Sequence, residues 1–362
     1  MKKAMYLRIL LILIVAVYAH TASSQGITTP RTPSPAARIS QTIGISTVEI
    51  SYSRPSVKDR EVWGKLVPFG YNVQNFGAGN EAPWRSGANE NTVITFSHPV
   101  EVAGNAVPAG TYGLFFVINE DNSGEVILSK DHQSWGSFWY DPKQDQLRAP
   151  IKIRDVAHTE TLTYDFINLD KNSGELVLNW EKKQFPVKLT FAVDEIVLAN
   201  AAEELKGVKG FTWQGYTSAA NYALQNKTNL DKGLEWIDIA IARNKAFPTL
   251  VVKSALLAET GKTADADAVM TEALSLATEA ELNNRGYQLL NQSKNAEAIE
   301  IFKLATERYP NSANAWDSLG EGYALSGDEK KAITSFKKSL KMNPPENVRA
   351  NSQKYLKQLG AL

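Results

Sequence analysis

The chain has 362 residues, of which 43% are hydrophobic and 22% charged, so it is long enough for two or three folded domains and its composition excludes global disorder. It has no cysteine, which excludes disulfide bonds and a lipid anchor on a cysteine. The formal net charge is zero, so the chain lacks the basic surplus typical of nucleic-acid binding, and no nucleic-acid partner is expected.

The N-terminal segment predicts an exported protein. Basic residues flank the start of a short apolar run at 9–17, which is shorter than the roughly 20 residues needed to span a bilayer. Small residues follow it, so residues 1–24 have the pattern of a cleavable signal peptide, cut between Ser24 and Gln25. Cleavage leaves a net charge of about −3 and no membrane span. We expect a periplasmic or secreted protein; the alternative is an uncleaved anchor.

Residues 37–199 have the pattern of an all-β domain. Before them, residues 25–36 contain three prolines among small polar residues, which predicts an extended leader. From there polar and apolar residues alternate with period two, for example at 48–52 and 176–180. Gly-, Asn- and Asp-containing turns separate these runs. The pattern predicts an antiparallel sandwich or barrel.

Residues 200–345 change to a helical period, and a 34-residue repeat appears in them. The repeat matches the tetratricopeptide pattern, in which small residues let two helices approach, aromatic residues fill the space between hairpins, and proline ends the second helix. The residues that carry the pattern are Gly286, Ala298, Phe302, Pro310, Trp316, Leu319, Gly320, Tyr323, Ala332, Phe336 and Pro344.

The repeat predicts an all-α solenoid behind the β domain. The clearest units cover 282–345, weaker ones precede them, and we expect about four helix pairs in all. Residues 346–362 have the pattern of a capping helix, which such arrays need to cover their last apolar face. The stack has a concave face suited to a protein or peptide segment, although it also suits a structural support for the β domain.

The β domain resembles a known family. The matching residues are Ser34, Pro35, Gln41, Gly44, Tyr52 to Pro55, Trp84 to Glu90 and Pro108 to Tyr112. They are similar to the family catalogued as domain of unknown function 2911, over about residues 34–195. The resemblance implies export, with tetratricopeptide repeats behind the domain in some members, and implies no activity. Two departures are Asp59, where glycine is expected, and an insertion at 71–83 that lengthens the loop before Trp84.

The segment 84–90 is the first candidate site. It combines an aromatic ring, a guanidinium, an amide and a carboxylate in a loop before a strand, a setting in which ligand-binding residues often occur. Arg85 and Glu90 are candidates to recognise a polar ligand; alternatively they pair with each other, or with Arg54 and Asp131, to fix the loop.

A second candidate is the aromatic cluster at 135–141, whose rings suit either stacking on sugars or packing in the core. The complete set of candidate ligand-binding residues is Arg54, Trp84, Arg85, Asn89, Glu90, Asp131, Trp135 and Trp139.

No catalytic signature accompanies these candidates. The carboxylates Glu81, Glu90, Asp131, Asp141 and Asp145 would make a glycosidase pair only at a defined separation in space. The histidines have no metal-ligand spacing, no nucleophile elbow or phosphate loop is present, and neither a metal nor a cofactor is expected. The sequence favours a non-enzymatic interaction scaffold of the cell envelope. The alternatives are a carbohydrate-binding or carbohydrate-processing β domain tethered by the repeats, and a hydrolase of unknown class.

Overall fold

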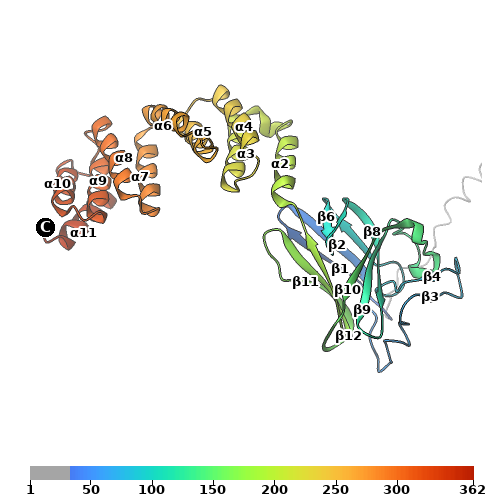
Figure 1. Ribbon diagram of the computed structural model, residues 1–362. Coiled ribbons are helices and arrows are strands. Elements are labelled where there is room, and N and C mark those ends of the chain that lie inside the picture. The colour runs from blue at the N-terminus through green and yellow to red at the C-terminus, as the bar shows by residue number, and fades with distance from the viewer. Residues whose placement is uncertain (1–32) are drawn as a thin grey trace, which may run out of the picture. The chain divides into compact units, whose positions relative to one another are not determined.

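The structure is a computed structural model that describes residues 33–362 (Figure 1). The described residues fall into two compact units, with the division between Ile196 and Val197. The predicted signal peptide at 1–24 and most of the leader at 25–36 lie outside the described residues. Among the helices that are described, none combines the length and the apolar character that a membrane crossing requires.

Antiparallel sheets build the first unit, here called the β unit. In its described part, a six-stranded sheet has the order β1-β2-β5-β8-β9-β10 and a four-stranded sheet the order β11-β12-β6-β7, while β3 and β4 form a small separate hairpin. The strands are β1 (Ala36–Ile43), β2 (Ser46–Ser53), β3 (Asn72–Val73), β4 (Glu81–Ala82), β5 (Val93–Phe96), β6 (Val100–Val102), β7 (Asn105–Val107), β8 (Gly110–Ile118), β9 (Ser123–Ser129), β10 (Asp145–Lys152), β11 (Arg154–Ile167) and β12 (Ser173–Thr190). This sandwich-like layout confirms the predicted antiparallel β fold.

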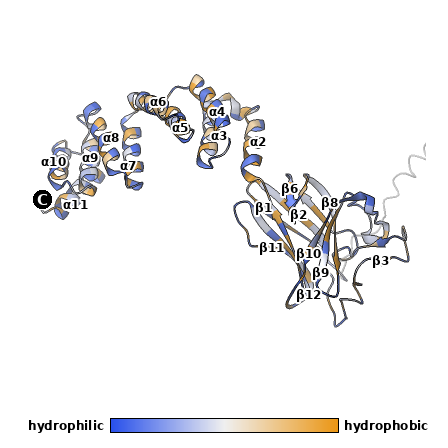
Figure 2. Cartoon of the chain, viewed as in Figure 1, coloured by the Kyte–Doolittle hydropathy of each residue, from blue (hydrophilic) through white to orange (hydrophobic). Residues whose placement is uncertain are grey.

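The period-two pattern places the core of the β unit. In β2 Val48 and Ile50 are fully buried, and in β12 Leu178 and Trp180 are buried as well, while intervening residues are more exposed. Figure 2 shows the hydrophobic residues concentrated in the strands of this unit, with hydrophilic residues in the loops. Burial of apolar surface therefore fixes which face of each strand points inward.

The central strand β8 is buried on both faces, so it departs from simple alternation. On its outer face, Phe115 and Val117 form a second apolar cluster with Ala82 of β4 and Tyr140. Tyr140 follows a short 3₁₀ helix, η1 (Gly136–Trp139). The segment before Trp84 and the η1 segment thus cover the outer face of the six-stranded sheet.

Helices build the second unit, here called the helical unit. In the described chain they form four pairs, α3–α4, α5–α6, α7–α8 and α9–α10, followed by α11. The helices are α2 (Val193–Glu204), α3 (Trp213–Gln225), α4 (Leu230–Arg243), α5 (Phe247–Glu259), α6 (Thr263–Leu276), α7 (Glu279–Asn291), α8 (Asn295–Arg308), α9 (Ala313–Leu325), α10 (Glu329–Lys341) and α11 (Glu346–Gln358). The stack confirms the predicted helical solenoid. Helix α2 begins at Val193, within the range 37–199 assigned to the β domain, and Asp194 and Glu195 in its first turn favour a helix start.

The repeat residues take the places that their sizes suggest. A side chain at Gly320 would lie 2.8 Å from the buried ring of Phe336, so glycine lets that ring contact α9 directly. Gly286 and Phe302 repeat this contact one unit earlier. Leu356 of α11 packs with Phe336 in one buried cluster, so α11 covers the last apolar face of the stack.

Candidate functional site

A pocket of about 660 Å³ opens in the β unit beside the loop 84–90. Three candidate residues, Trp84, Arg85 and Asn89, line it. Further lining residues come from the segment 55–74 and from Trp180 of β12. The pocket has the size of a small-molecule site, which is typically about 300–1,000 Å³.

Backbone and side-chain hydrogen bonds hold the loop 84–90 on the sheets. Trp84 and Phe116 of β8 exchange two backbone hydrogen bonds, each 3.0 Å long. The Ser86 carbonyl accepts from the Tyr164 hydroxyl at 3.0 Å and from the Thr92 hydroxyl at 3.2 Å. Ser86 has a left-handed φ of 58°, a conformation that needs such support in a residue other than glycine. The loop is therefore set in place independently of any ligand.

Arg85 extends from this loop into a partly buried position. Its Nη1 donates to the Asn89 carbonyl at 2.6 Å, and its guanidinium lies 5.0 Å from the centre of the Phe138 ring. Burial lowers the pKa of Arg85. A Cβ at Gly136 would come within 2.3 Å of the guanidinium, and Gly136 has a left-handed φ of 61°, so glycine suits this position. Arg85 has a carbonyl and a ring as neighbours where the sequence suggested a carboxylate.

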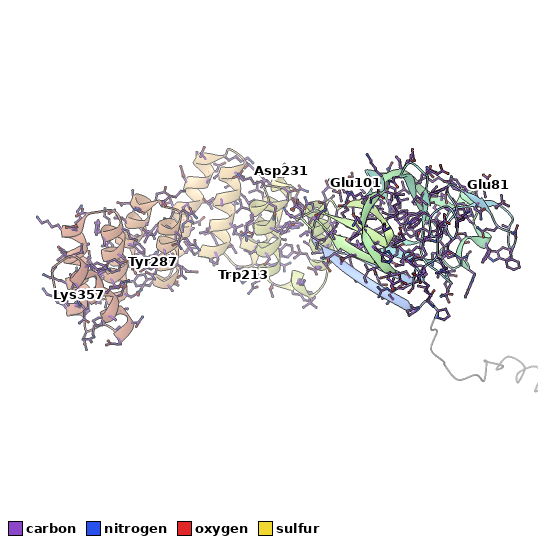
Figure 3. All side chains as sticks on the ribbon, turned by 90° about the horizontal axis from the view of Figure 1, so that it is seen from below. Glu81, Glu101, Trp213, Asp231, Tyr287 and Lys357 are labelled. Carbon is purple, nitrogen blue, oxygen red and sulfur yellow. The ribbon has the colours of Figure 1, made fainter. Side chains whose placement is uncertain are left out.

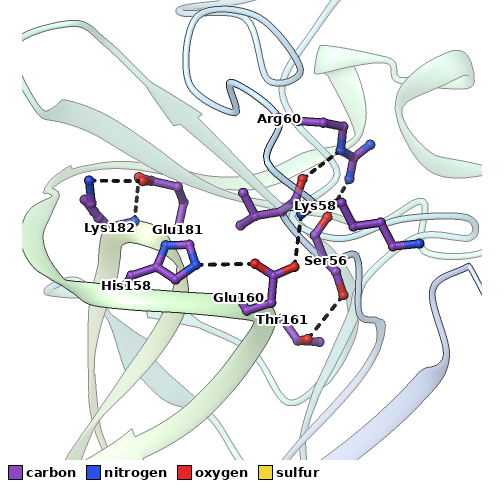
Figure 4. Close-up of polar contacts among 9 residues, drawn as sticks. Ser56, Lys58, Arg60, His158, Glu160, Thr161, Glu181 and Lys182 are labelled. Carbon is purple, nitrogen blue, oxygen red and sulfur yellow. Dashed lines mark hydrogen bonds and ion pairs between the residues drawn. The ribbon is translucent and has the colours of Figure 1, made fainter.

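Two further cations, Lys58 and Arg60, belong to a turn at the pocket rim (Figure 4). The Lys58 amide donates to Glu160 Oε1 at 3.0 Å, which is the main reason that the pKa of Glu160 is lowered. Figure 4 shows the Lys58 ammonium extending away from Glu160. Arg60 donates to the carbonyls of Val57 and Ser56, at 3.0 and 2.5 Å.

Asp59, the departure from the family pattern, lies in the same turn. Its φ is 55°, in the left-handed region that glycine favours, and Lys58 beside it has a φ of 50°. Aspartate tolerates this conformation better than most residues. The expected glycine thus corresponds to a real backbone requirement, which this chain meets with a different residue.

The insertion at 71–83 forms one wall of the pocket. Asn72 of β3, Gln74, Ala82 of β4 and Pro83 all line it. Ala82 is also part of the apolar cluster on the outer face of β8, so the insertion is packed against the sheet. The second departure from the family pattern therefore contributes directly to the site.

The remaining charged candidates lie apart from the pocket. Arg54 donates to the Leu162 carbonyl at 2.9 Å and to the Thr163 hydroxyl at 2.7 Å, so it joins β2 to β11. Asp131 accepts from the Gln133 amide at 3.3 Å within its own loop. Glu90 is exposed and lines a different, shallower pocket beside β1 and β2. The four charges Arg54, Arg85, Glu90 and Asp131 therefore do not converge on one cleft.

The aromatic candidates Trp135 and Trp139 lie on the surface, 49% and 50% exposed. Trp139 makes an edge contact with the exposed ring of Phe76, while Phe138 lies under Arg85. Neither exposed tryptophan lines the pocket. Sugar binding by these rings stays a prediction.

A polar network near this segment was not anticipated from the sequence. Arg148 donates to Asp145 at 2.5 Å and to the Tyr140 hydroxyl at 2.8 Å, and Tyr140 donates to Asp145 at 2.7 Å. Burial raises the pKa of Asp145 and, with the adjacent Asp145, that of Tyr140. Tyr71 extends the network by donating to Glu125. Because its charges are paired, the network is best explained as a support for the segment that carries the pocket wall.

The helical unit has two polar rows with the 34-residue spacing of the repeat, which we call the polar rows. One row runs through Asn283, Asp317 and Asn351, and the other through Tyr287, Glu321 and Tyr355. Each row takes one residue from each of α7, α9 and α11, helices that lie next to one another. Figure 3 labels Tyr287 among the side chains of this unit.

Hydrogen bonds connect the polar rows from one helix to the next. Asn351 donates to Asp317 at 2.8 Å and to Glu321 at 3.3 Å, and Tyr287 donates to Glu321 at 3.1 Å. Burial raises the pKa of Tyr287, and burial together with Glu321 raises the pKa of Tyr355 to about 12. Neither Asp317 nor Glu321 forms an ion pair with a described lysine or arginine.

Comparisons with known proteins match the two units separately. Residues 34–189 match the family model "Protein of unknown function (DUF2911)", and residues 313–346 match a "Tetratricopeptide repeat" model. A search of curated proteins gives no match.

Several solved structures are similar to part of the chain. They include YrrB, described as a TPR protein with an unusual peptide-binding site (19% identity over 44% of this chain and 84% of that one, TM-score 0.27). Another is MamA 41-end from Desulfovibrio magneticus RS-1 (18% identity over 42% of this chain and 94% of that one, TM-score 0.25). A third is Pseudomonas aeruginosa pilF (19% identity over 42% of this chain and 71% of that one, TM-score 0.26). Each covers less than half of this chain. Residues 34–189 thus form a DUF2911 domain, followed by a helical unit with tetratricopeptide repeats, as the sequence predicted.

Proposed function

We propose that this protein is an exported interaction scaffold of the cell envelope, in which the helical unit binds an extended segment of another protein. Tetratricopeptide repeats are typical of proteins that hold partners, and a stack of helix pairs offers a continuous surface along its first helices. The proposal for export rests on the signal-peptide pattern at 1–24.

The observation that carries the proposal is the pair of polar rows across α7, α9 and α11. Asp317 and Glu321 supply carboxylate oxygens, while Asn283 and Asn351 supply amides, at the spacing of successive repeats. Glu321 is only partly buried and accepts from Tyr287 and Asn351 with the same oxygen, Oε2, so the lone pairs of its Oε1 suit a further donor. An extended segment that crosses these helices would place its own donors against the rows.

The charge of the polar rows favours a basic segment. A lysine or arginine of the bound segment would pair with the carboxylate of Glu321, and charge-assisted hydrogen bonds of this kind are stronger than neutral ones. The hydrogen bonds already present keep Glu321 oriented before binding, which lowers the ordering cost.

A peptide-display selection on the purified chain tests this proposal. We expect the selected peptides to be enriched in lysine or arginine, and the Glu321→Gln variant to weaken their binding about tenfold, measured by calorimetry. Glu307→Gln on the second helix α8 is the matched control, because Glu307 is exposed and outside the polar rows; it should leave the affinity unchanged. Selection of peptides without basic residues, or equal effects of the two variants, would refute the proposal.

A further inference from the structure

The pocket of the β unit has a one-sided charge. Lys58, Arg60, Lys65 and Arg85 line it, and among its described lining residues none is aspartate or glutamate. None of these four cations forms an ion pair with a carboxylate of the described chain. Elsewhere in the same unit many basic side chains are paired, as Lys183 is with Asp155 at 2.6 Å.

The acidic neighbours of these cations in the sequence do not offset the pocket charge. Asp59 and Glu61 alternate with Lys58 and Arg60 along the chain, but both are exposed and lie outside the pocket lining. Glu160 accepts from the backbone amide of Lys58, and its ion pair in the described chain is with His158 and not with the Lys58 ammonium. The turn therefore separates the two signs of charge and directs the basic side chains to the pocket.

Among the four cations, Arg85 is the one whose position most favours a bound anion. Burial of a guanidinium without a counter-ion is unfavourable, and the lowered pKa of Arg85 expresses that cost. Gly136 leaves room for the guanidinium, and the hydrogen bond to the Asn89 carbonyl orients it. An anion in the pocket would supply the missing partner.

The inner wall of the pocket is aromatic. Trp84 stacks on Trp180 with ring centres 5.7 Å apart and an interplanar angle of 16°. Trp180 is 1% exposed, so Trp84, which is only partly buried, is the ring of this pair that a ligand in the pocket would contact. A flat apolar group suits the accessible part of the Trp84 ring, and an oxyanion suits the cations.

We propose that this pocket binds a small organic oxyanion, a molecule with a carboxylate, phosphate or sulfate group attached to a ring or another flat apolar body. Arg85 holds the oxyanion at the inner wall, and Lys58, Arg60 and Lys65 attract it at the rim. Trp84 packs against the ring. The site belongs to the β unit and does not depend on the proposed function of the helical unit.

Binding of matched pairs of probes to the full chain tests this inference. Phenyl phosphate and benzoate are the anionic probes, and phenol and benzamide are their neutral counterparts. We expect at least one anionic probe to bind more tightly than its neutral counterpart in calorimetry, to change the tryptophan fluorescence, and to bind several-fold more weakly when the salt concentration rises from 50 to 500 mM. Equal binding of charged and neutral probes, or no binding of any of the four, overturns the proposal.

Variants of the cations identify the pocket as the binding site. Arg85→Gln should weaken anion binding about tenfold. Because a change at a partly buried residue can disturb folding, the double variant Lys58→Gln/Lys65→Gln changes two exposed side chains instead and should weaken binding at least about fivefold. Lys130→Gln is the matched control, since Lys130 is exposed and does not line the pocket. A loss of binding in the control as large as that in the double variant overturns the proposal.

Discussion

At the scale of single residues, Asp317 has a distinctive electrostatic environment. It is 4% exposed, and burial raises the pKa of its carboxyl, although hydrogen bonds from Ser352 and Asn351 oppose the shift. A carboxyl whose pKa is higher in the folded than in the unfolded state binds protons preferentially in the folded state. Its contribution to stability is therefore complete below the unfolded pKa and is lost as the pH rises through the folded pKa.

The variant Asp317→Asn should remove this pH dependence. We expect the difference in free energy of unfolding, wild type minus variant, to decrease as the pH rises from about 4 to 7, by about 1.4 kcal/mol for each unit of pKa shift. Denaturant unfolding followed by circular dichroism at 222 nm measures it.

The control Asp328→Asn should show the opposite sign. Asp328 is partly exposed and its pKa is lowered by Lys331, so its contribution is lost as the pH falls through the folded pKa. The same trend in both variants would contradict this account.

Some residues of the pocket could be predicted from the sequence and others could not. Trp84, Arg85 and Asn89 were candidates for ligand binding because they lie together in one loop; they line the pocket, and ligand binding by them stays a prediction. Lys58 and Arg60 were missed because acidic neighbours cancel their charge in the sequence. Trp180 lies 96 positions after Trp84 in the chain, and only the pairing of the sheets brings the two rings together.

At the scale of elements, the glycine contacts of the repeats determine how closely paired helices pack. A Cβ at Gly320 would approach the Phe336 ring to 2.8 Å, and one at Gly286 would approach the Phe302 ring to 2.2 Å. Both rings are fully buried, so they have little room to move. The sequence predicted these helices from composition and period, because the repeat imposes the same local requirement twice.

Gly320→Ala should therefore destabilise the helical unit even though alanine is the better helix former by about 1 kcal/mol. We expect the free energy of unfolding to fall by about 1–3 kcal/mol, the usual cost of overpacking a core. The exposed Asn284→Ala change in α7 is the control, and should be neutral or stabilising by less than about 0.7 kcal/mol. Thermal unfolding followed by circular dichroism at 222 nm compares the two variants. A stabilised Gly320→Ala variant would show that the Phe336 ring can move to accommodate the added methyl group.

At the scale of the whole molecule, the sequence predicts the type of each unit, while the strand order is known only from the structure. The period-two pattern predicted an antiparallel β unit, and the 34-residue repeat predicted a helical solenoid after it. Both predictions were possible because each pattern shows which faces of the elements are buried. The pairing order of the strands depends on contacts between residues distant in the sequence, and no local pattern encodes it. The proposed localisation of the protein rests on residues 1–24, which the structure does not describe.

Cleavage of the predicted signal peptide tests this localisation. When the full chain is expressed in a bacterial host with two membranes, we expect the protein in the periplasmic or secreted fraction, with an intact mass that corresponds to a chain beginning at Gln25. Signal cleavage requires small residues at the first and third positions before the cut, here Ser24 and Ala22, whereas Ser23 between them is less restricted. Ala22→Gln should therefore leave the precursor uncleaved in the membrane fraction, while Ser23→Gln should mature normally. A wild-type protein that keeps residues 1–24 in the membrane fraction would instead establish an uncleaved anchor, and would restrict the partners of the helical unit to those at the membrane surface.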